Sequence, residues 1–415
     1  MIEERLDRQL RIKGWDQEAL GSSQVGIVGD DDLLASLFVL SASALGINDL
    51  IVLAPRLDSD LVAIASKMNP KFNLAFLKGY FNHPALSDIF SGSRVLVDLS
   101  AYGLANKLAV DTAFATGKPL VRGFRYRNFR QYGLKIFTYV RGKEHEELGS
   151  IISPNNLPQK RSDDAVLDTI AAGIALEEVK NLLLGWKVSP DLITYGAVRG
   201  TPNGSHPRAL VVGAGALGNF VAMGLAYSGI TGMTIMDPDR VEIANLNRQV
   251  FFYDAIGRGK AETLASRINE RFGAGAKFAP GGFDRNTDIS GFDAVFDCVD
   301  NFETRIIMSE KGRTGRKVVI SGGTSATAGQ VIVFDPAEDG PTPAELLGLY
   351  EIVDSRKAEA VEKSRASCRY VPDPSVIMTN QIVAGLMVDA YRVFLNGNSP
   401  ANIFYNAESD RKILT

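Results

Sequence analysis

Short apolar runs alternate along this chain with longer segments of helical periodicity, and the same order occurs twice. VGIVG at 25–29 and ALVVG at 209–213 each read as a short buried strand. Each half then ends in a long segment whose apolar residues recur with helical period. The corresponding segments are 25–29 and 209–213, 51–57 and 235–241, 95–101 and 294–300, 116–137 and 314–334, and 165–185 and 375–395.

This alternation of strand and helix predicts an α/β fold with a mostly parallel, doubly wound sheet in each half. At 415 residues the chain is too long for one ordinary core, so two Rossmann-like domains in tandem are expected. We place the first domain at 1–185 and the second at 209–415. The segment between them, 186–208, is rich in proline, glycine and polar residues and is predicted to be a linker.

Composition excludes several classes of protein. A charged fraction of 22% and a hydrophobic fraction of 45% are those of an ordinary globular protein. A net charge of −3 gives no general attraction to nucleic acid or membranes, so neither is expected as a partner. The N-terminus is charged and no apolar run is long enough to span a bilayer, so we expect a cytoplasmic protein.

Cysteine and histidine are too scarce for a metal site built from them. The two cysteines, Cys298 and Cys368, cannot form a four-thiolate zinc site. The three histidines are scattered through the sequence, and we interpret each as a surface or loop residue. No zinc is therefore expected, and a disulfide is not expected either.

The two halves differ at the turn that follows their first strand. In the second half, GAGALG (213–218) is the G-x-G-x-x-G dinucleotide fingerprint, which fits NAD, FAD, S-adenosylmethionine or ATP. In the first half, Asp31 and Leu34 correspond to Gly215 and Gly218. Carboxylates at such a turn would block and repel a phosphate. The second half is therefore predicted to hold the nucleotide, and the first to be its structural partner.

Two further acids occur only in the second half, each at the end of a predicted strand. Asp237 corresponds to Ala54 and stands where an acid holds a ribose hydroxyl. Asp300 corresponds to Ala101 and stands at the carboxyl edge of the sheet, a place suited to a Mg²⁺ ligand. A hydride-transfer site has no need of Arg248 beside the phosphates, whereas a site that splits a triphosphate does.

Taken together, these motifs resemble the ThiF-like adenylyltransferases, which include the ubiquitin-activating enzymes. The resemblance implies binding of ATP and Mg²⁺ and adenylation of the C-terminal carboxylate of a small ubiquitin-fold protein or a peptide. The segments that carry it are GAGALGN (213–219), DPDRVEIANLNRQ (237–249), GRGKAE (257–262) and DCVDN (297–301). The residues it assigns to the nucleotide are Gly213, Gly215, Gly218, Asp237, Asp239, Asn245, Arg248 and Lys260, with Asp300 on Mg²⁺.

The N-terminal segment RLDRQLRIKGW (5–15) resembles the helix from which family dimers extend an arginine into the partner's nucleotide site. Arg8 matches that arginine, and the linker before the second half has no such segment. The resemblance therefore implies an internal pseudo-dimer, in which an inactive first adenylation domain completes the site of an active second one.

Cys368 is the candidate thioester residue. It lies in a polar segment, about 336–374, that corresponds to the crossover loop of the family, where activating enzymes keep such a cysteine or an insert that carries it. Lys363, Arg365 and Arg369 flank Cys368 and would favour its thiolate. Cys298, inside an apolar strand, is instead predicted to be a core residue.

The resulting prediction is a compact, single-chain activating enzyme of bacterial type. It would adenylate a ubiquitin-like protein, form a thioester on Cys368 and pass the protein to a conjugating enzyme. Family association alone links such proteins to antiviral defence. Three alternatives remain: adenylation without a thioester, serving a sulfur carrier or a peptide; a nicotinamide-dependent oxidoreductase, resting on GAGALG alone; and a non-enzymatic scaffold.

Overall fold

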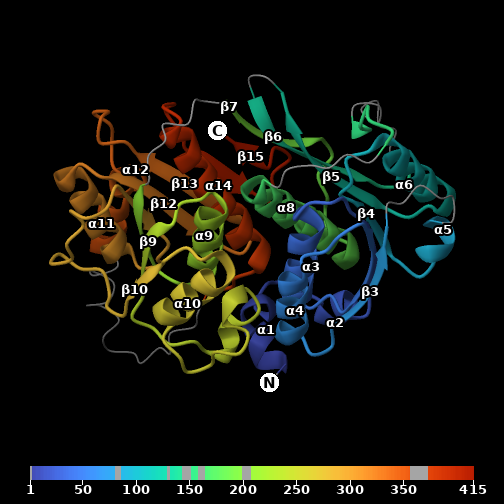
Figure 1. Ribbon diagram of the computed structural model, residues 1–415, viewed down its shortest axis with the longest axis horizontal. Helices are drawn as coiled ribbons and strands as arrows, with labels where there is room; N and C mark the ends of the chain where they lie inside the picture. Colours follow the sequence, from blue (N-terminus) through green and yellow to red (C-terminus); the bar gives the residue numbers. More distant parts are fainter. Residues whose placement is uncertain are drawn as a thin grey trace.

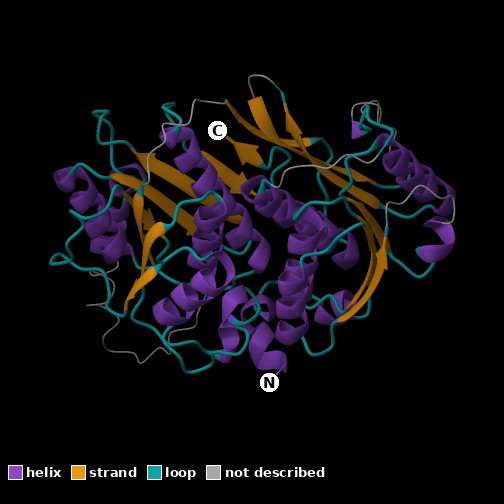
Figure 2. Ribbon diagram, in the orientation of Figure 1, coloured by secondary structure: helices purple, strands orange, loops and turns teal. Residues whose placement is uncertain are grey.

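A computed structural model describes residues 2–79, 86–128, 131–142, 151–157, 164–198, 207–355 and 373–415. Figure 1 shows two α/β halves side by side, the first in blue to green and the second in yellow to red. Each half has a curved sheet, and helices fill the space between the two sheets (Figure 2). The prediction of two tandem, doubly wound α/β units is confirmed.

In the described part of the first half, one sheet has the strand order β3-β2-β1-β4-β5-β6-β7. The neighbouring strands from β3 to β5 pair in parallel. Strand β6 pairs antiparallel with β5 on one side and with β7 on the other. The bounds are β1 (Gln24–Val28), β2 (Asp49–Ala54), β3 (Asn73–Lys78), β4 (Val95–Asp98), β5 (Leu120–Arg127), β6 (Gln131–Tyr139) and β7 (Ile193–Val198). The helices are α1 (Ile2–Leu10), α2 (Gln17–Gly21), α3 (Leu34–Leu45), α4 (Ser59–Met68), α5 (Leu86–Ile89), α6 (Gly103–Thr116) and α8 (Ala165–Leu184).

The sheet of the second half repeats this plan with the order β10-β9-β8-β11-β12-β13-β14-β15. The bounds are β8 (Arg208–Val212), β9 (Gly232–Met236), β10 (Lys277–Ala279), β11 (Ala294–Asp297), β12 (Val318–Thr324), β13 (Ala328–Phe334), β14 (Ile403–Asn406) and β15 (Ile413–Leu414). The helices are α9 (Ala216–Tyr227), α10 (Lys260–Phe272), α11 (Phe302–Gly315), α12 (Pro343–Leu346) and α14 (Ile377–Leu395), with 3-10 turns η1 (Ile243–Asn245) and η2 (Val250–Phe252).

Residues 193–198 depart from the linker expected at 186–208. They form β7, which pairs antiparallel with β6 and so belongs to the first sheet. The β-branched and aromatic residues of ITYGAV suit a strand, and the proline and glycine residues around them hid it in the sequence.

The strand order reverses direction once in each half. From β8 the chain runs outward to β9 and β10 and then returns to the other side at β11. Ligands of open α/β sheets bind where this reversal occurs, outside the carboxyl ends of the strands. Val212, Met236 and Asp297, the last residues of β8, β9 and β11, lie level in the sheet. The turns that follow them therefore meet at one place.

The two halves share one hydrophobic core. Helices α3 and α8 of the first half and α9 and α14 of the second are buried on nearly all sides. A helix that is apolar all round has to lie inside a protein. These four helices pack together between the sheets, and α14 lies against both α8 and α9 (Figure 1). A single apolar cluster continues from the first half into the second.

A glycine on each of the two central helices allows their close approach. A Cβ atom on Gly173 of α8 would lie 2.7 Å from Ile382, and one on Gly385 of α14 would overlap Ile170. The same contact is thus made twice across the pseudo-symmetric pair. The spacing of α8 and α14 depends on both glycines.

A buried polar cluster also joins the halves. Asp389 of α14, which is fully buried, accepts hydrogen bonds from the hydroxyls of Tyr132 on β6 (3.0 Å) and Tyr195 on β7 (2.7 Å). Burial raises the pKa of Asp389, and the charge of Arg392 opposes that rise. Arg392 in turn pairs with Asp164, at the start of α8. The first half thus satisfies a carboxylate that the second half buries.

None of the helices in the described residues is long and apolar enough to cross a membrane.

Tyr195→Phe should lower the free energy of unfolding by about 1–3 kcal/mol, because it leaves a buried carboxylate short of one donor. The change is measured by equilibrium denaturation. Tyr253→Phe is the matched control, since the Tyr253 side chain is only partly buried and its hydroxyl makes no hydrogen bond with the described residues. Equal stability of the two variants would contradict a contribution of this cluster to the contact between the two halves.

Candidate functional site

The turn between β8 and α9 holds the glycines of the fingerprint, and each has a separate physical role. Gly213 has φ +97°, and a Cβ there would lie 2.7 Å from the carbonyl oxygen of Cys298. A Cβ on Gly218 would overlap the carbonyl oxygen of Gly213, so this glycine brings helix and turn together. A Cβ on Gly215 would meet nothing within 4 Å. Gly215 therefore leaves open space above the turn.

Side chains from neighbouring elements hold this turn in place. The carboxylate of Asp237, just after β9, accepts the N–H of Ala214 (2.6 Å) and that of Asp239 (2.8 Å). Asn219 donates to the carbonyls of Ala214 and Gly215 and accepts the N–H of Phe251. Sequence reasoning gave Asn219 no role, although it is the last residue of the GAGALGN motif.

Helix α9 begins at this turn without a side-chain cap. Gly215 is its N-cap residue and supplies no oxygen to the first N–H groups. Unsatisfied N–H groups at a helix start carry partial positive charge and favour an anion.

Two arginines, one from each half, influence each other electrostatically. Burial lowers the pKa of Arg248 to about 10, with a further lowering from the positive charge of Arg8, while Asp300 and Asp7 oppose the shift. Nη1 of Arg248 donates to the Ala244 carbonyl (2.7 Å) and to Asn247 (2.8 Å). Its Nε and Nη2 groups make no hydrogen bond with the described residues.

Arg8 lies on α1, which packs against η1 of the second half. Nη1 of Arg8 donates to the carbonyl of Asp373 (2.7 Å), and the N–H of Ser375 donates to the Arg8 carbonyl (3.3 Å). The N-terminal helix is thus attached to the segment that leads into α14. Of the predicted site residues, Arg8 is the one from the first half.

Lys260 and Asn245 are the two other predicted phosphate contacts. Lys260 is the first residue of α10 and pairs with the exposed Asp239 at 2.8 Å. Asn245 is buried in η1, where its side-chain oxygen accepts the N–H of Glu242 (2.9 Å) in a capping box. Its amide nitrogen makes no hydrogen bond with the described residues.

Asp300 follows β11 by three residues and is exposed. The next residue, Asn301, caps α11 by accepting the N–H of Thr304. The Asp300 carboxylate therefore has no capping role, and its negative charge opposes the lowering of the pKa of Arg248. In the described residues no group of three or more acids, histidines and cysteines could hold a metal by itself. One free carboxylate fits Mg²⁺, which is usually bound by one or two carboxylates together with substrate phosphates.

Beneath the site, Asp297 and Arg305 form a buried ion pair that sequence reasoning missed. Nε of Arg305 donates to Asp297 at 3.0 Å, and Nη2 donates to the Ser321 hydroxyl at 2.8 Å. The signal was the aspartate inside the apolar run VFDCVD, because a carboxylate buried in a strand needs a partner. The adjacent Cys298 is buried, and burial raises its thiol pKa well above the usual value, so it remains a neutral thiol.

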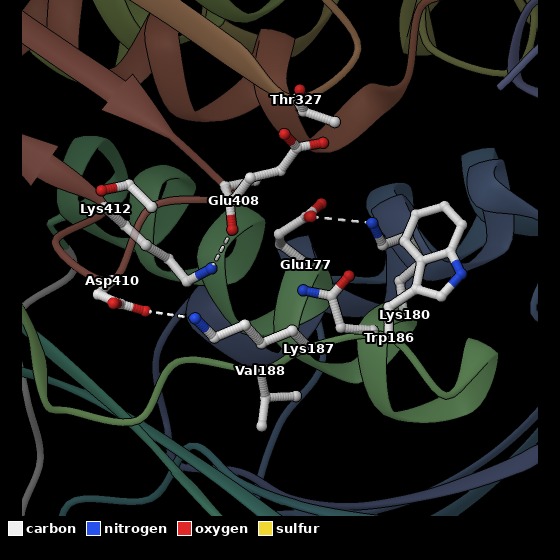
Figure 3. A pocket seen from close by; sticks show the side chains of 12 residues that line it. Glu177, Lys180, Trp186, Lys187, Val188, Thr327, Glu408, Asp410 and Lys412 are labelled. Atoms are coloured by element: carbon white, nitrogen blue, oxygen red, sulfur yellow. Dashed lines mark hydrogen bonds and ion pairs between the residues drawn. The ribbon is translucent and has the colours of Figure 1, made fainter. Parts of the chain in front are cut away.

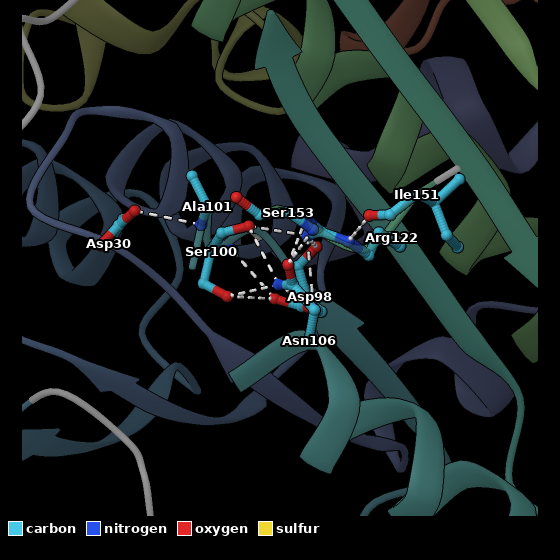
Figure 4. A network of polar contacts seen from close by, with 8 residues as sticks. All are labelled: Asp30, Asp98, Ser100, Ala101, Asn106, Arg122, Ile151 and Ser153. Carbon is cyan, nitrogen blue, oxygen red and sulfur yellow. Dashed lines mark hydrogen bonds and ion pairs between the residues drawn. The ribbon is translucent and has the colours of Figure 1, made fainter. Parts of the chain in front are cut away.

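The first half has carboxylates at the corresponding turn. Asp30 accepts the N–H of Ala101 (3.0 Å), the residue that corresponds to Asp300 (Figure 4). Asp32 accepts the N–H of Leu34, the first residue of α3, and pairs with Arg125 at 3.0 Å. A built-in negative charge therefore lies at the start of α3, where the second half has an open helix end.

The first half has a corresponding buried ion pair, in which the aspartate has the same place but the arginine comes from a different element. Asp98 ends β4 as Asp297 ends β11, and Arg122 of β5 pairs with it at 3.3 Å. In the second half the residue that corresponds to Arg122 is Ser321, and the arginine comes from α11 instead. Arg122 also donates to the Ile151 carbonyl and thereby holds residues 151–157 over this edge (Figure 4).

A cavity of about 260 Å³ lies elsewhere, between α8, the segment after it and the β14–β15 turn (Figure 3). None of the predicted site residues lines it. Two ion pairs line it: Lys180 with Glu177 at 2.9 Å, and Lys187 with Asp410 at 2.7 Å. This cavity is therefore separate from the candidate site.

Cys368 lies outside the described residues, which stop at 355 and resume at 373. Its proposed thioester role stays a prediction.

A sequence model of the ThiF family matches residues 197–411, which is just over half of the chain. Molybdopterin-synthase adenylyltransferase of Salmonella typhimurium is 35% identical over 139 residues, covering 32% of this chain and 56% of that protein. Adenylyltransferase and sulfurtransferase MOCS3 of Caenorhabditis briggsae is 30% identical over 155 residues, covering 36% of this chain and 39% of that protein.

A shorter match is the NEDD8-activating enzyme E1 catalytic subunit of Arabidopsis thaliana, 42% identical over 76 residues, or 18% of this chain and 16% of that protein. Among solved structures, E. coli MccB with succinimide covers 50% of this chain and 62% of that one at 20% identity, with a TM-score of 0.42. This chain therefore spans less than two thirds of each of these relatives.

Gly218→Ala should lower the free energy of unfolding by about 1–3 kcal/mol, because the added methyl group has no room. Gly215→Ala should change it by less than about 0.5 kcal/mol, because its φ of −69° is ordinary and the space is open. Denaturant melts of both variants test this pair. Equal destabilisation would mean that the turn is not shaped as described.

Proposed function

The chain belongs to the ThiF family, and we propose that its second half adenylates the C-terminal carboxylate of a ubiquitin-like protein with ATP. The nucleotide would lie over the turn at 213–218. The relatives support adenylation as the reaction class, since two of them are named adenylyltransferases and a third is named an activating enzyme. Those names support the reaction class only, and the ubiquitin-like protein as the acyl substrate is part of our proposal.

One observation carries this proposal: α1, which holds Arg8, packs against η1 just before Arg248, and the segment that follows Arg248 is hydrogen-bonded to the uncapped first turn of α9 through Phe251 and Asn219. Burial is the main cause of the lowered pKa of Arg248, and repulsion from the positive charge of Arg8 adds to it. An anion between them would relieve this repulsion and would be favoured by both charges. Nε and Nη2 of Arg248 form a free edge with the geometry that guanidinium groups use for phosphate.

For adenylation, the protein mainly has to place the carboxylate in line with the α-phosphate and stabilise the charge on the phosphates. A C-terminal carboxylate is ionised at neutral pH and needs no general base. Its oxygen would form a bond to the α-phosphorus while the bond from that phosphorus to the departing pyrophosphate breaks. Arg8, Arg248 and Lys260 would stabilise the charge on the phosphates as it moves toward pyrophosphate. Mg²⁺, held by Asp300 and the phosphates, would supply further neutralisation when bound.

Asp237 and Asn245 would contact the nucleotide in addition to their present roles. Each Asp237 oxygen accepts one backbone N–H, which leaves lone pairs for a ribose hydroxyl. The free amide nitrogen of Asn245 would donate to a phosphate. Lys260 would exchange its exposed partner Asp239 for phosphate, a small loss because exposed ion pairs contribute little.

The first half is proposed to be inactive and to serve as the partner that supplies Arg8. Asp30 and Asp32 use their carboxylates on backbone N–H groups at the corresponding turn. A phosphate there would meet negative charge in place of open N–H groups. This arrangement supports one nucleotide site per chain.

Cys368 is proposed to attack the acyl adenylate, forming a thioester and releasing AMP, before the protein passes to a conjugating enzyme. The alternative is adenylation alone. It is favoured by the names of the molybdopterin-synthase and sulfurtransferase relatives. The paired zinc cysteines of sulfur-carrier activators are missing from this sequence, which speaks against the sulfur version.

Arg248→Ala should reduce ATP–pyrophosphate exchange, measured with a ubiquitin-like protein, by about 10²–10³-fold, because a buried donor to the reacting phosphates is lost. Arg8→Ala should reduce it similarly, although Arg8 belongs to the other half. Arg208→Ala is the control, since this exposed arginine begins β8 at the opposite edge of the sheet. Exchange that survives Arg248→Ala, or NAD binding in place of ATP, would refute the adenylation site.

Cys368→Ala should leave exchange intact and abolish a thiol-sensitive adduct between the chain and the ubiquitin-like protein, because only the thioester step needs the thiol. The adduct is detected on a non-reducing gel with and without dithiothreitol. Cys298→Ala is the control, as its thiol is buried. Exchange without an adduct in the wild type would favour adenylation alone.

A further inference from the structure

Two wholly buried amides connect the candidate site to the first half. Asn247 follows η1 and Gln9 lies on α1, and neither is exposed to solvent. Nη1 of Arg248 donates to Oδ1 of Asn247 (2.8 Å), and Nδ2 of Asn247 donates to Oε1 of Gln9 (3.0 Å). Nε2 of Gln9 then donates to the Leu45 carbonyl (2.8 Å). These bonds form a continuous chain from Arg248 to α3.

The two ends of this chain fix the orientation of both amides. Arginine has only donors, so Asn247 must turn its oxygen toward Arg248. The Leu45 carbonyl only accepts, so Gln9 must turn its nitrogen toward Leu45. Asn247 is then left with its nitrogen facing the oxygen of Gln9, as the distances require. Neither amide can be reversed without placing two donors or two acceptors together.

The electrostatics favour the same direction. Leu45 is the last residue of α3, and its carbonyl lies at the negative end of that helix. A buried cation at one end and a helix C-terminus at the other polarise the intervening amides in the same sense. Gln17 strengthens the hold on Gln9, since its Oε1 accepts from Nε2 of Gln9 at 2.6 Å.

We propose that Gln9 and Asn247 are positioning residues: they hold Nη1 of Arg248 so that its free edge faces the nucleotide, and the first half thereby sets the geometry of the second half's site. This rests on the proposed function. The first half would then contribute twice, through Arg8 and through the orientation of Arg248.

The test is a double-mutant cycle on ATP affinity, measured by calorimetry on the full chain with Mg²⁺. Gln9→Met keeps the length of the side chain and removes its hydrogen bonds. It should weaken ATP binding by about fivefold, the usual net effect of one or two hydrogen bonds. In an Arg248→Ala background the same change should alter affinity by less than about twofold, because a residue that acts through Arg248 has nothing left to orient.

The matched control is Gln381→Met. Gln381 of α14 is also wholly buried and also spans the halves, accepting from Ser41 (2.7 Å) and donating to the Thr169 carbonyl (2.9 Å). It bonds to no candidate site residue. Its substitution should lower the melting temperature much as Gln9→Met does while leaving ATP affinity unchanged.

A second variant, Asn247→Leu, has a similar volume, adds no charge and removes both hydrogen bonds of Asn247. It therefore tests the hydrogen-bonded bridge from Arg248 through Asn247 to Gln9 if Gln9→Met does not fold. Its effect on ATP affinity should also disappear with Arg248→Ala. Additive effects in the cycle, or unchanged affinity in both single variants, would overturn the bridge and leave the nucleotide site standing. A wild-type chain that binds no ATP would overturn the proposed function and the bridge with it.

Discussion

The burial of α8 and α14 against each other is the contact on which the rest of this structure depends. Both helices are buried on nearly every side, and each lies in the core of the other half as well as in its own. Gly173 and Gly385 bring the two helices close, and Asp389 accepts hydrogen bonds from two tyrosines of the other half. The halves therefore fold as one unit.

This shared core determines where the N-terminal helix lies. Helix α1 is held on the first half by Arg5 and Gln9, which donate to the C-terminal carbonyls of α3. Since α3 is packed in the same core, α1 is placed against η1 of the second half. The proposed site, with a cation from each half, would thus depend on apolar packing some distance away, because a shift between the two halves would separate Arg8 from Arg248.

The two halves have the same strand order but differ in the buried and turn-forming polar residues that it carries. Both have a buried aspartate at the end of the strand after the reversal, and both neutralise it with an arginine, taken from β5 in one half and from α11 in the other. At the turn above, one half leaves a helix end open and the other closes it with Asp32. The same strand order is compatible with either source of the arginine and with an open or a capped helix start, because the sheet fixes the backbone positions.

The sequence by itself determined the repeated α/β plan and the glycine turn that follows the first strand of the second half, and it predicted that charged residues lie after neighbouring strands. These follow from local patterns: periodicity identifies the strands and helices, and parallel strands bring their carboxyl ends together. The family resemblance identified Arg8. The sequence did not separate β7 from the linker around it, because that strand is short and flanked by loop residues.

Tertiary structure alone decided which of these residues have partners. The bridge through Gln9 and Asn247, the pairing of Asp297 with Arg305 and the contact of Arg8 with the Asp373 carbonyl join positions that no periodicity relates. Gln9 and Asn247 are 238 residues apart. Hydrogen bonds between such positions depend on distance and direction in space, which the packing of α8 on α14 sets and the order of residues along the chain does not.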